Sequence, residues 1–310
     1  KQVSISKSTV GGSEVVGATM QILDQDGNII DEWISEGKEH FANNLEEGKS
    51  YILHEDLSPL GLNLANDIEF EVTYDKENQK VEMIDTINDV SKVKEDGKQL
   101  KGAELTVVSN KTKQIVDRWT TGQHIFDVTE DMQSQIKENK KSEGMYIDED
   151  DSTITYSISK NKDRDDYRLV FVKDGTTTYA NIDLNGDETS HMIEGLIAGK
   201  EYVLRETKTP NGYATSKEQT FKVEENKDIS LTLIDEDIKV QISKQDITNK
   251  KEIEGAKLKV VDKDGNNIDE WTSGKEPHMI KNLNVGESYT LIEETAPQGY
   301  KIAESIDFKI

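Results

Sequence analysis

The pattern from which the fold can be predicted is clearest near the end of the chain, in Leu283-Asn-Val-Gly286-Glu-Ser-Tyr289-Thr-Leu-Ile-Glu293-Glu-Thr-Ala-Pro297-Gln-Gly299-Tyr300. It contains Leu-x-x-Gly-x-x-Tyr, then a Glu four positions after the Tyr, then Pro-x-Gly. The same elements occur twice upstream, at Leu45, Gly48, Tyr51, Glu55, Pro59 and Gly61 and again at Leu196, Gly199, Tyr202, Glu206, Pro210 and Gly212. Such repetition indicates consecutive copies of one structural unit, called here the first, second and third repeats.

The three Trp residues define the extent of each repeat. Trp33, Trp119 and Trp271 follow the Gly of a Gly-Ala pair by 16 or 17 positions. Trp and Tyr are 18 positions apart in the first and third repeats but 83 apart in the second, which therefore carries an insertion of 65 residues at about 127–189. We expect three domains, at 1–86, 87–236 and 237–310, of which the third lacks its last strand.

Within each repeat, apolar and polar residues alternate as they do in half-buried strands. Val3-Ser-Ile5-Ser-Lys7 and Tyr51-Ile-Leu53-His-Glu55 are examples, and Asp26-Gly27 is a strong hairpin signal. Many short strands with turns at regular spacing predict an all-β fold of tandem immunoglobulin-like sandwiches.

The insertion at 127–189 has a different pattern. Val128, Met132 and Ile136 are spaced by four and follow a cap-like start, which predicts a short amphipathic helix over 127–139. The ranges 152–159, 167–172 and 176–182 predict strands. We expect a mixed helix and strand subdomain, or a lid, on the side of the second sandwich, because such ordered patterning argues against a loop.

Composition excludes several classes of function. The chain has 62 acidic and 38 basic residues and a net charge of −24, so we expect repulsion from nucleic acids and anionic membranes. No stretch approaches the roughly 20 apolar residues of a transmembrane helix, so direct membrane insertion is not expected. The chain has no Cys, which excludes disulfides, thiolate metal sites and Cys nucleophiles. Since neither a signal peptide nor an initiator Met is present, we expect a mature fragment of a longer protein.

We expect no metal and no cofactor. His40, His191 and His278 share one register but belong to separate repeats, so they would not converge on an ion, and a structural role in a turn is expected for each. The loop at 183–188 is similar to a calcium-binding loop, but its Gly is misplaced and no bidentate Glu follows at the twelfth position.

Each repeat places ionisable residues on strand faces that are otherwise apolar. Lys7 has the strand parity of Val3 and Ile5, and Glu55 has that of Tyr51 and Leu53. The side chains expected to point into the cores are a first-strand Lys, a central-strand Glu and, in the first two repeats, a last-strand Asp: Lys7, Glu55 and Asp85; Lys92, Glu206 and Asp235; Lys244 and Glu293.

Burying three ionisable groups costs free energy unless they neutralise one another or react. Burial favours the uncharged amine and the protonated carboxyl, and such a pair is poised for condensation. The amine would attack the Asp carboxyl carbon, the Glu would shuttle protons, and water would leave. The alternative is a buried ion network that never reacts. Asn88 is an alternative partner in the first repeat, although it lies three residues after Asp85 and out of phase with it.

Several segments resemble the collagen-adhesin B-type (Cna B-type) domains of Gram-positive surface proteins, also called SpaA-type pilin domains. They are Gly17-Ala-Thr-Met-Gln-Ile-Leu-Asp, Trp33-Ile-Ser-Glu-Gly and the stretch from Tyr289 to Tyr300, which is similar to the pilin E-box. The resemblance implies prealbumin-like sandwiches and autocatalytic isopeptide bonds. The implied bonds are Lys7–Asp85 and Lys92–Asp235, with Glu55 and Glu206 as the catalytic proton shuttles.

Two departures from the family pattern matter. The partner of Lys244 would fall beyond Ile310, so we expect Glu293 to be idle and no bond to form there in this chain. The first repeat lacks the Thr and the final Tyr of the E-box.

These features predict a structural stalk segment of a cell-wall-anchored adhesin or pilus-associated protein. We expect it outside the cell, anchored through a region beyond this sequence, and not an enzyme apart from single-turnover self-crosslinking. The alternatives are a ligand-binding adhesin region with the insertion as binding surface, a pilin subunit, and an accessory module of a secreted hydrolase. Expected partners are a host extracellular-matrix protein or other pilus subunits, and the chain is expected to be a monomer in solution.

Overall fold

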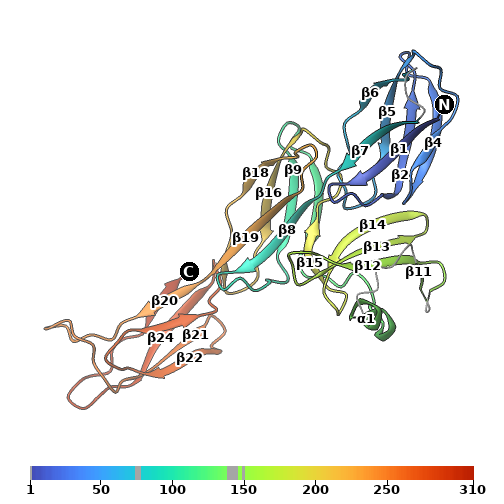
Figure 1. Cartoon of the computed structure of the whole chain (residues 1–310). Helices are drawn as coiled ribbons and strands as arrows, with labels where there is room; N and C mark the ends of the chain where they lie inside the picture. Colours follow the sequence, from blue (N-terminus) through green and yellow to red (C-terminus); the bar gives the residue numbers. More distant parts are fainter. Residues whose placement is uncertain (1, 74–77, 138–145, 149–150) are drawn as a thin grey trace. The chain divides into compact units, whose positions relative to one another are not determined.

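The computed structural model describes residues 2–73, 78–137, 146–148 and 151–310 (Figure 1). The chain divides into two compact units. The first unit comprises Lys1–Val93, Gln99–Thr207 and Lys217–Leu233, and the second comprises Lys94–Lys98, Lys208–Ser216 and Ile234–Ile310. The first unit therefore holds the first repeat, most of the second repeat and the insertion.

The first repeat is a sandwich of two sheets. Its strands are β1 (Gln2–Thr9), β2 (Val16–Leu23), β3 (Ile29–Glu36), β4 (His40–Ala42), β5 (Ser50–Leu57), β6 (Ile68–Glu71) and β7 (Asn78–Asp85). One sheet has the order β4-β1-β7 and the other β3-β2-β5-β6. β1 and β7 run parallel, with Lys7 opposite Met83 and Thr9 opposite Asp85. The first and last strands of the repeat are therefore neighbours, as an end-to-end crosslink requires.

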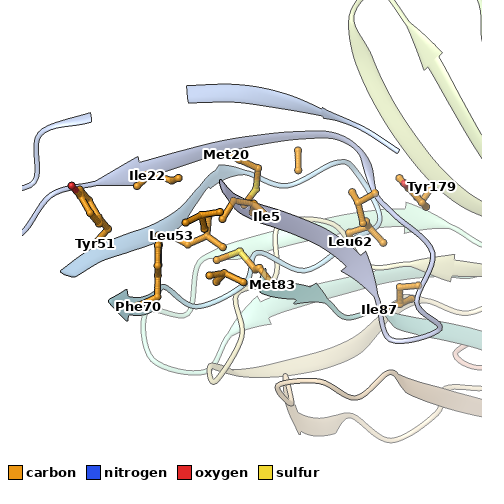
Figure 2. Packing of buried hydrophobic residues seen from close by; sticks show 14 of the residues in the cluster. Ile5, Met20, Ile22, Tyr51, Leu53, Leu62, Phe70, Met83, Ile87 and Tyr179 are labelled. Atoms are coloured by element: carbon orange, nitrogen blue, oxygen red, sulfur yellow. The ribbon is translucent and has the colours of Figure 1, made fainter. Parts of the chain in front are cut away.

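The core of the first repeat is apolar and is formed by the strand faces that the alternation of residues predicted to be buried. Ile5, Met20, Ile22, Leu53 and Met83 are each at most 1% exposed, and Figure 2 shows them between the two sheets. Burying each such side chain contributes roughly 1.5–3 kcal/mol to folding. Any charged group among them is consequently removed from water.

The second repeat is also built from two sheets, one of which is longer. Its strands are β8 (Asn88–Lys94), β9 (Glu104–Ser109), β10 (Ile115–Thr120), β15 (Glu188–Met192), β16 (Glu201–Lys208), β17 (Tyr213–Ala214), β18 (Gln219–Lys222) and β19 (Ile229–Asp237). The range of the insertion contains α1 (Glu130–Lys137), β11 (Tyr146–Ile147), β12 (Thr155–Lys160), β13 (Tyr167–Lys173) and β14 (Thr176–Ile182). The shorter sheet has the order β10-β9-β16-β18, and the longer has the order β11-β12-β13-β14-β15-β8-β19-β17.

The insertion extends a sheet of the second repeat and is not a lid over it. β12, β13 and β14 pair in series and continue onto β15. Phe126, Met132, Tyr156, Leu169 and Ile182 form a small core of their own in this region. The helix begins at residue 130, three residues later than predicted, and residues 138–139 of the predicted helix lie outside the described residues. No helix in the described ranges combines the length and apolar character needed to cross a bilayer.

The third repeat has the same two-layer plan with fewer strands. They are β20 (Lys239–Ile242), β21 (Lys257–Asp262), β22 (Asn267–Thr272), β23 (His278–Lys281), β24 (Ser288–Thr295) and β25 (Ile306–Lys309). The sheets have the orders β20-β23 and β22-β21-β24-β25. Within the described part of the chain β20 has one neighbour, whereas β1 lies between two.

Each of the three repeats is built from two β-sheets, and this confirms the prediction of an all-β fold of tandem sandwiches.

Candidate functional site

Three ionisable side chains meet inside the first sandwich and are called here the Lys7 cluster: Lys7, Glu55 and Asp85. Lys7 lies in β1 and Asp85 ends β7, while Glu55 reaches across from β5 in the opposite sheet. Each of the three residues is at most 2% exposed. Lys7 Nζ donates to Asp85 Oδ1 and lies 3.0 Å from Glu55 Oε2. One amine therefore contacts two carboxyl groups in the absence of bulk water.

The environment of the Lys7 cluster favours a protonated Asp85. Burial raises the pKa of Asp85 to about 8, and the Glu55 carboxyl adds to this effect, while the Lys7 amine opposes it. Glu55 Oε1 and Asp85 Oδ2 are buried and find no hydrogen-bond donor among the described residues. A carboxylic acid proton would satisfy these oxygens. Burial therefore favours the form of the Asp85 carboxyl whose hydroxyl can leave as water.

Neighbouring residues hold the reactive groups in position. The backbone N–H of Ala65 donates to Glu55 Oε2 at 2.8 Å, and that of Lys7 donates to Glu14 Oε2 at 3.2 Å. The role of Glu14 was not predicted from the sequence. The sequence signal for it is a Glu seven or eight positions after the lysine, because in the third repeat the backbone N–H of Lys244 likewise donates to Glu252 Oε2, at 3.0 Å.

The second repeat reproduces the lysine–glutamate pair. Lys92 on β8 and Glu206 on β16 have fully buried side chains, and Lys92 Nζ lies 3.0 Å from Glu206 Oε2. Asp235 is fully buried on β19, the strand next to β8 in the sheet order. The pairing of Lys92 with Asp235 remains a prediction.

The third repeat has the lysine and the glutamate in a more open setting. Lys244 Nζ lies 3.1 Å from Glu293 Oε2, which also accepts from the backbone N–H of Ala303 at 2.6 Å. The Lys244 side chain is 17% exposed, compared with 3% for that of Lys7. The described residues of this repeat include no strand at the place that β7 occupies in the first repeat.

The three histidines of common register lie in strands and not in turns, so that part of the prediction was wrong. Each ring stacks on the Trp of its own repeat, with centroids 3.9, 4.1 and 4.2 Å apart, and each pairs with the Asp two positions before that Trp. The sets are His40, Trp33 and Asp31; His191, Trp119 and Asp117; and His278, Trp271 and Asp269.

His191 is the most strongly bound of the three histidines. Its ring lies 2.9 Å from Asp117 and 2.6 Å from Glu188. Burial alone would lower its pKa, but the hydrogen bonds to the two carboxylates outweigh burial and raise the pKa to about 9. Across the residues that the structure describes, no group of three or more His, Asp or Glu side chains is arranged to hold a metal ion.

Comparison with known proteins agrees with the resemblance of the sequence motifs. Residues 1–87, 165–237 and 238–310 each match the family model described as SpaA, a prealbumin-like fold domain. No curated protein matches the chain.

Similar solved structures share little sequence with the chain. They include the Bacillus anthracis TIE protein, with 17% identity, a TM-score of 0.30 and coverage of 100% of this chain and 48% of that one. The shaft pilin SpaA from Lactobacillus rhamnosus GG has 14% identity and a TM-score of 0.28, with coverage of 77% and 98%. BcpA, the major pilin subunit of Bacillus cereus, has 14% identity and a TM-score of 0.25, with coverage of 100% and 95%. The chain spans about half the length of the TIE protein.

The family match covers more than half of the 310 residues and falls on all three repeats. The described strands form the two-layer sandwiches that a prealbumin-like fold requires. The chain therefore belongs to the family of SpaA prealbumin-like fold domains.

Proposed function

We propose that the chain is a stalk segment of a Gram-positive adhesin or pilus-associated surface protein, in which internal amide bonds lock the first two repeats. The observation that carries the proposal is the Lys7 cluster, which brings an amine of the first strand against a carboxyl of the last strand. Membership of the SpaA domain family supports the extracellular setting. Anchoring to the cell wall, and partners such as other surface subunits or a host matrix protein, are parts of the proposal.

The proposed bond forms by condensation within the Lys7 cluster. The uncharged Lys7 amine attacks the Asp85 carboxyl carbon, and a C–N bond forms. Glu55 takes a proton from the nitrogen and delivers it to the Asp85 hydroxyl, the C–O bond breaks, and water leaves. One amine and one carboxylic acid thus give one amide and one water. Lys92, Glu206 and Asp235 would react in the same way, and each site turns over once.

The position of the proposed bond suits a load-bearing stalk. β1 and β7 are the terminal strands of the first repeat and lie side by side in parallel. A pulling force that enters at one strand and leaves at the other would pass directly through the Lys7–Asp85 amide. The 78 positions between the two residues would then be shielded from extension.

Single-molecule force spectroscopy on the whole chain tests this function. Lys7→Ala removes the amine, whereas Lys49→Ala removes an exposed amine of the same repeat and serves as the control. The Lys7→Ala chain is expected to release an additional roughly 260–280 Å on unfolding, because 78 positions become extensible at about 3.3–3.6 Å each. Equal released lengths for the parent and Lys7→Ala would show that no crosslink bears load in the first repeat.

A further inference from the structure

A tyrosine of the insertion belongs to the core of the first repeat. Tyr179, on β14, is 7% exposed and packs in the cluster that contains Ile5 and Met83, not in the small core of the insertion. Figure 2 shows it at the end of this core where Leu62 and Ile87 lie. The first repeat therefore depends on a residue that lies outside it in the sequence.

Backbone hydrogen bonds join β14 to the first repeat. The N–H of Leu60 donates to the carbonyl of Thr177 at 3.0 Å, and the N–H of Tyr179 donates to the carbonyl of Leu60 at 2.8 Å. The fit is close, because a Cβ on Gly61 would lie 2.4 Å from the Tyr179 carbonyl oxygen. A Cβ on Gly17 would lie 2.1 Å from Thr177 Oγ1. This contact leaves no room for a side chain at either glycine.

Hydrogen bonds link Tyr179 to the strand that carries Lys7. Its hydroxyl accepts a hydrogen bond from the backbone N–H of Val16 at 3.1 Å, and the neighbouring Val15 N–H donates to the Lys7 carbonyl at 2.7 Å. Burial raises the pKa of Tyr179 to about 12, and the charge of Asp85 contributes to that rise. The Tyr179 hydroxyl is therefore connected to the Lys7 strand through two successive backbone N–H groups, those of Val16 and Val15.

The loop that Tyr179 contacts is the loop that orients Glu55. This loop, residues 59–65, contacts β14 through Leu60 near its start. It ends at Ala65, whose N–H donates to Glu55 Oε2. Leu64, between them, exchanges two backbone hydrogen bonds of 2.9 Å with Leu196 and Ala198 of the second repeat. Both ends of the loop are consequently fixed by residues outside the first repeat.

The third repeat shows the same loop without such support. Ala303 takes the place of Ala65 and donates to Glu293, but its loop is exposed throughout residues 301–305. Leu62 is 2% exposed, whereas Tyr300, at the same distance after its Glu, is 47% exposed. Burial of the loop in the first repeat is therefore not an inherent property of this fold.

We propose that Tyr179 of the insertion is a positioning residue for crosslink formation in the first repeat. It closes the end of the core and secures loop 59–65, which keeps the Lys7 cluster aligned and shielded from water. The proposal rests on the proposed crosslinking function. Since Tyr179 follows Asp85 in the chain, the first repeat reaches its full rate of crosslinking only after the insertion has been synthesised and has folded onto it.

The test measures the rates of both crosslinks in the full chain. The protein is made by cell-free translation, samples are quenched in acid at intervals, and the Lys7–Asp85 and Lys92–Asp235 peptides are quantified by mass spectrometry after digestion. The second bond is an internal reference for folding of the second repeat. The variants are Tyr179→Ala and Tyr179→Phe, with Tyr146→Ala, at an exposed position of the same insertion, as the matched control.

Tyr179→Ala is expected to slow the Lys7–Asp85 bond at least tenfold and to leave the Lys92–Asp235 bond at the parent rate. Tyr179→Phe keeps the ring and is expected to restore most of the rate, which a general loss of folding would not allow. A Lys7–Asp85 bond formed at the parent rate in Tyr179→Ala would overturn the inference, as would equal slowing of both bonds. Absence of the Lys7–Asp85 bond from the parent chain would instead overturn the proposed function.

Discussion

Replacing Glu55 by Gln is the substitution that most directly separates the proposed amide bond from the packing around it. Gln has nearly the shape of Glu, so the core of the first repeat changes little in volume. The amide cannot carry a proton from the Lys7 nitrogen to the Asp85 hydroxyl. Glu55→Gln is therefore expected to leave the first repeat folded but not crosslinked.

The size of the effect follows from the loop that the bond closes. Lys7 and Asp85 are 78 positions apart, and a crosslink over such a loop stabilises the folded state by about 4.5 kcal/mol in the chain-entropy model. For a domain of about 60–100 residues, 1 kcal/mol shifts the Tm by about 4–8 °C. We expect Glu55→Gln to lower the Tm of the first repeat by roughly 20–35 °C.

The assay is differential scanning calorimetry of the full chain, combined with intact mass to count the bonds in each sample. Glu71→Gln, at an exposed position on β6, is the matched control and is expected to melt like the parent. The reasoning would be refuted if Glu55→Gln lacked the bond and still melted within about 2 °C of the parent. It would also be refuted if the bond formed at the parent rate without the carboxylate.

Three further predictions concern the other sites and the effect of pH. Asp235→Ala is expected to remove one of two crosslinks, so the mass deficit of the denatured chain should fall from about 36 to about 18 Da. The rate of crosslinking in the first repeat is expected to fall as the pH rises through about 8, where Asp85 loses its proton, and quenched time courses from pH 6 to 10 would measure this. The raised pKa of His191 means that its stabilisation is complete below about pH 6.5 and is lost as the pH rises through about 9. We expect the second repeat to lose about 3 kcal/mol over that range in urea titrations, and a His191→Gln variant to lack this loss.

Much of the fold could be predicted because the repeats carry strong local signals. Alternation placed Lys7 and Glu55 on buried strand faces, and both are buried. The strands at 167–173 and 176–182 were predicted within one residue. The prediction of a lid was wrong because alternation identifies strands but not their neighbours. The insertion joins the sheet of the second repeat through the pairing of β15 with β8, in which His191 lies opposite Val90, and this contact is distant in sequence.

The composition of the candidate site was predictable, but its surroundings were not. Parity and spacing pointed to Lys7, Glu55 and Asp85 because the strand period is fixed at two. Tyr179 gave no signal, because it sits in an ordinary alternating strand of the insertion and packs into another repeat. The stacking of each histidine on its Trp was also missed, since equal register does not show which side chains of two different sheets meet.

The most direct test of the central claim is the mass of the intact, denatured 310-residue chain, measured to within one dalton. Each amide bond removes one water, so two bonds, Lys7–Asp85 and Lys92–Asp235, predict a mass about 36 Da below that of the sequence. Digestion should recover both as crosslinked peptides, with Lys244 unmodified. The full unmodified mass would contradict the account and would show that the buried lysines and carboxyls are only ion networks.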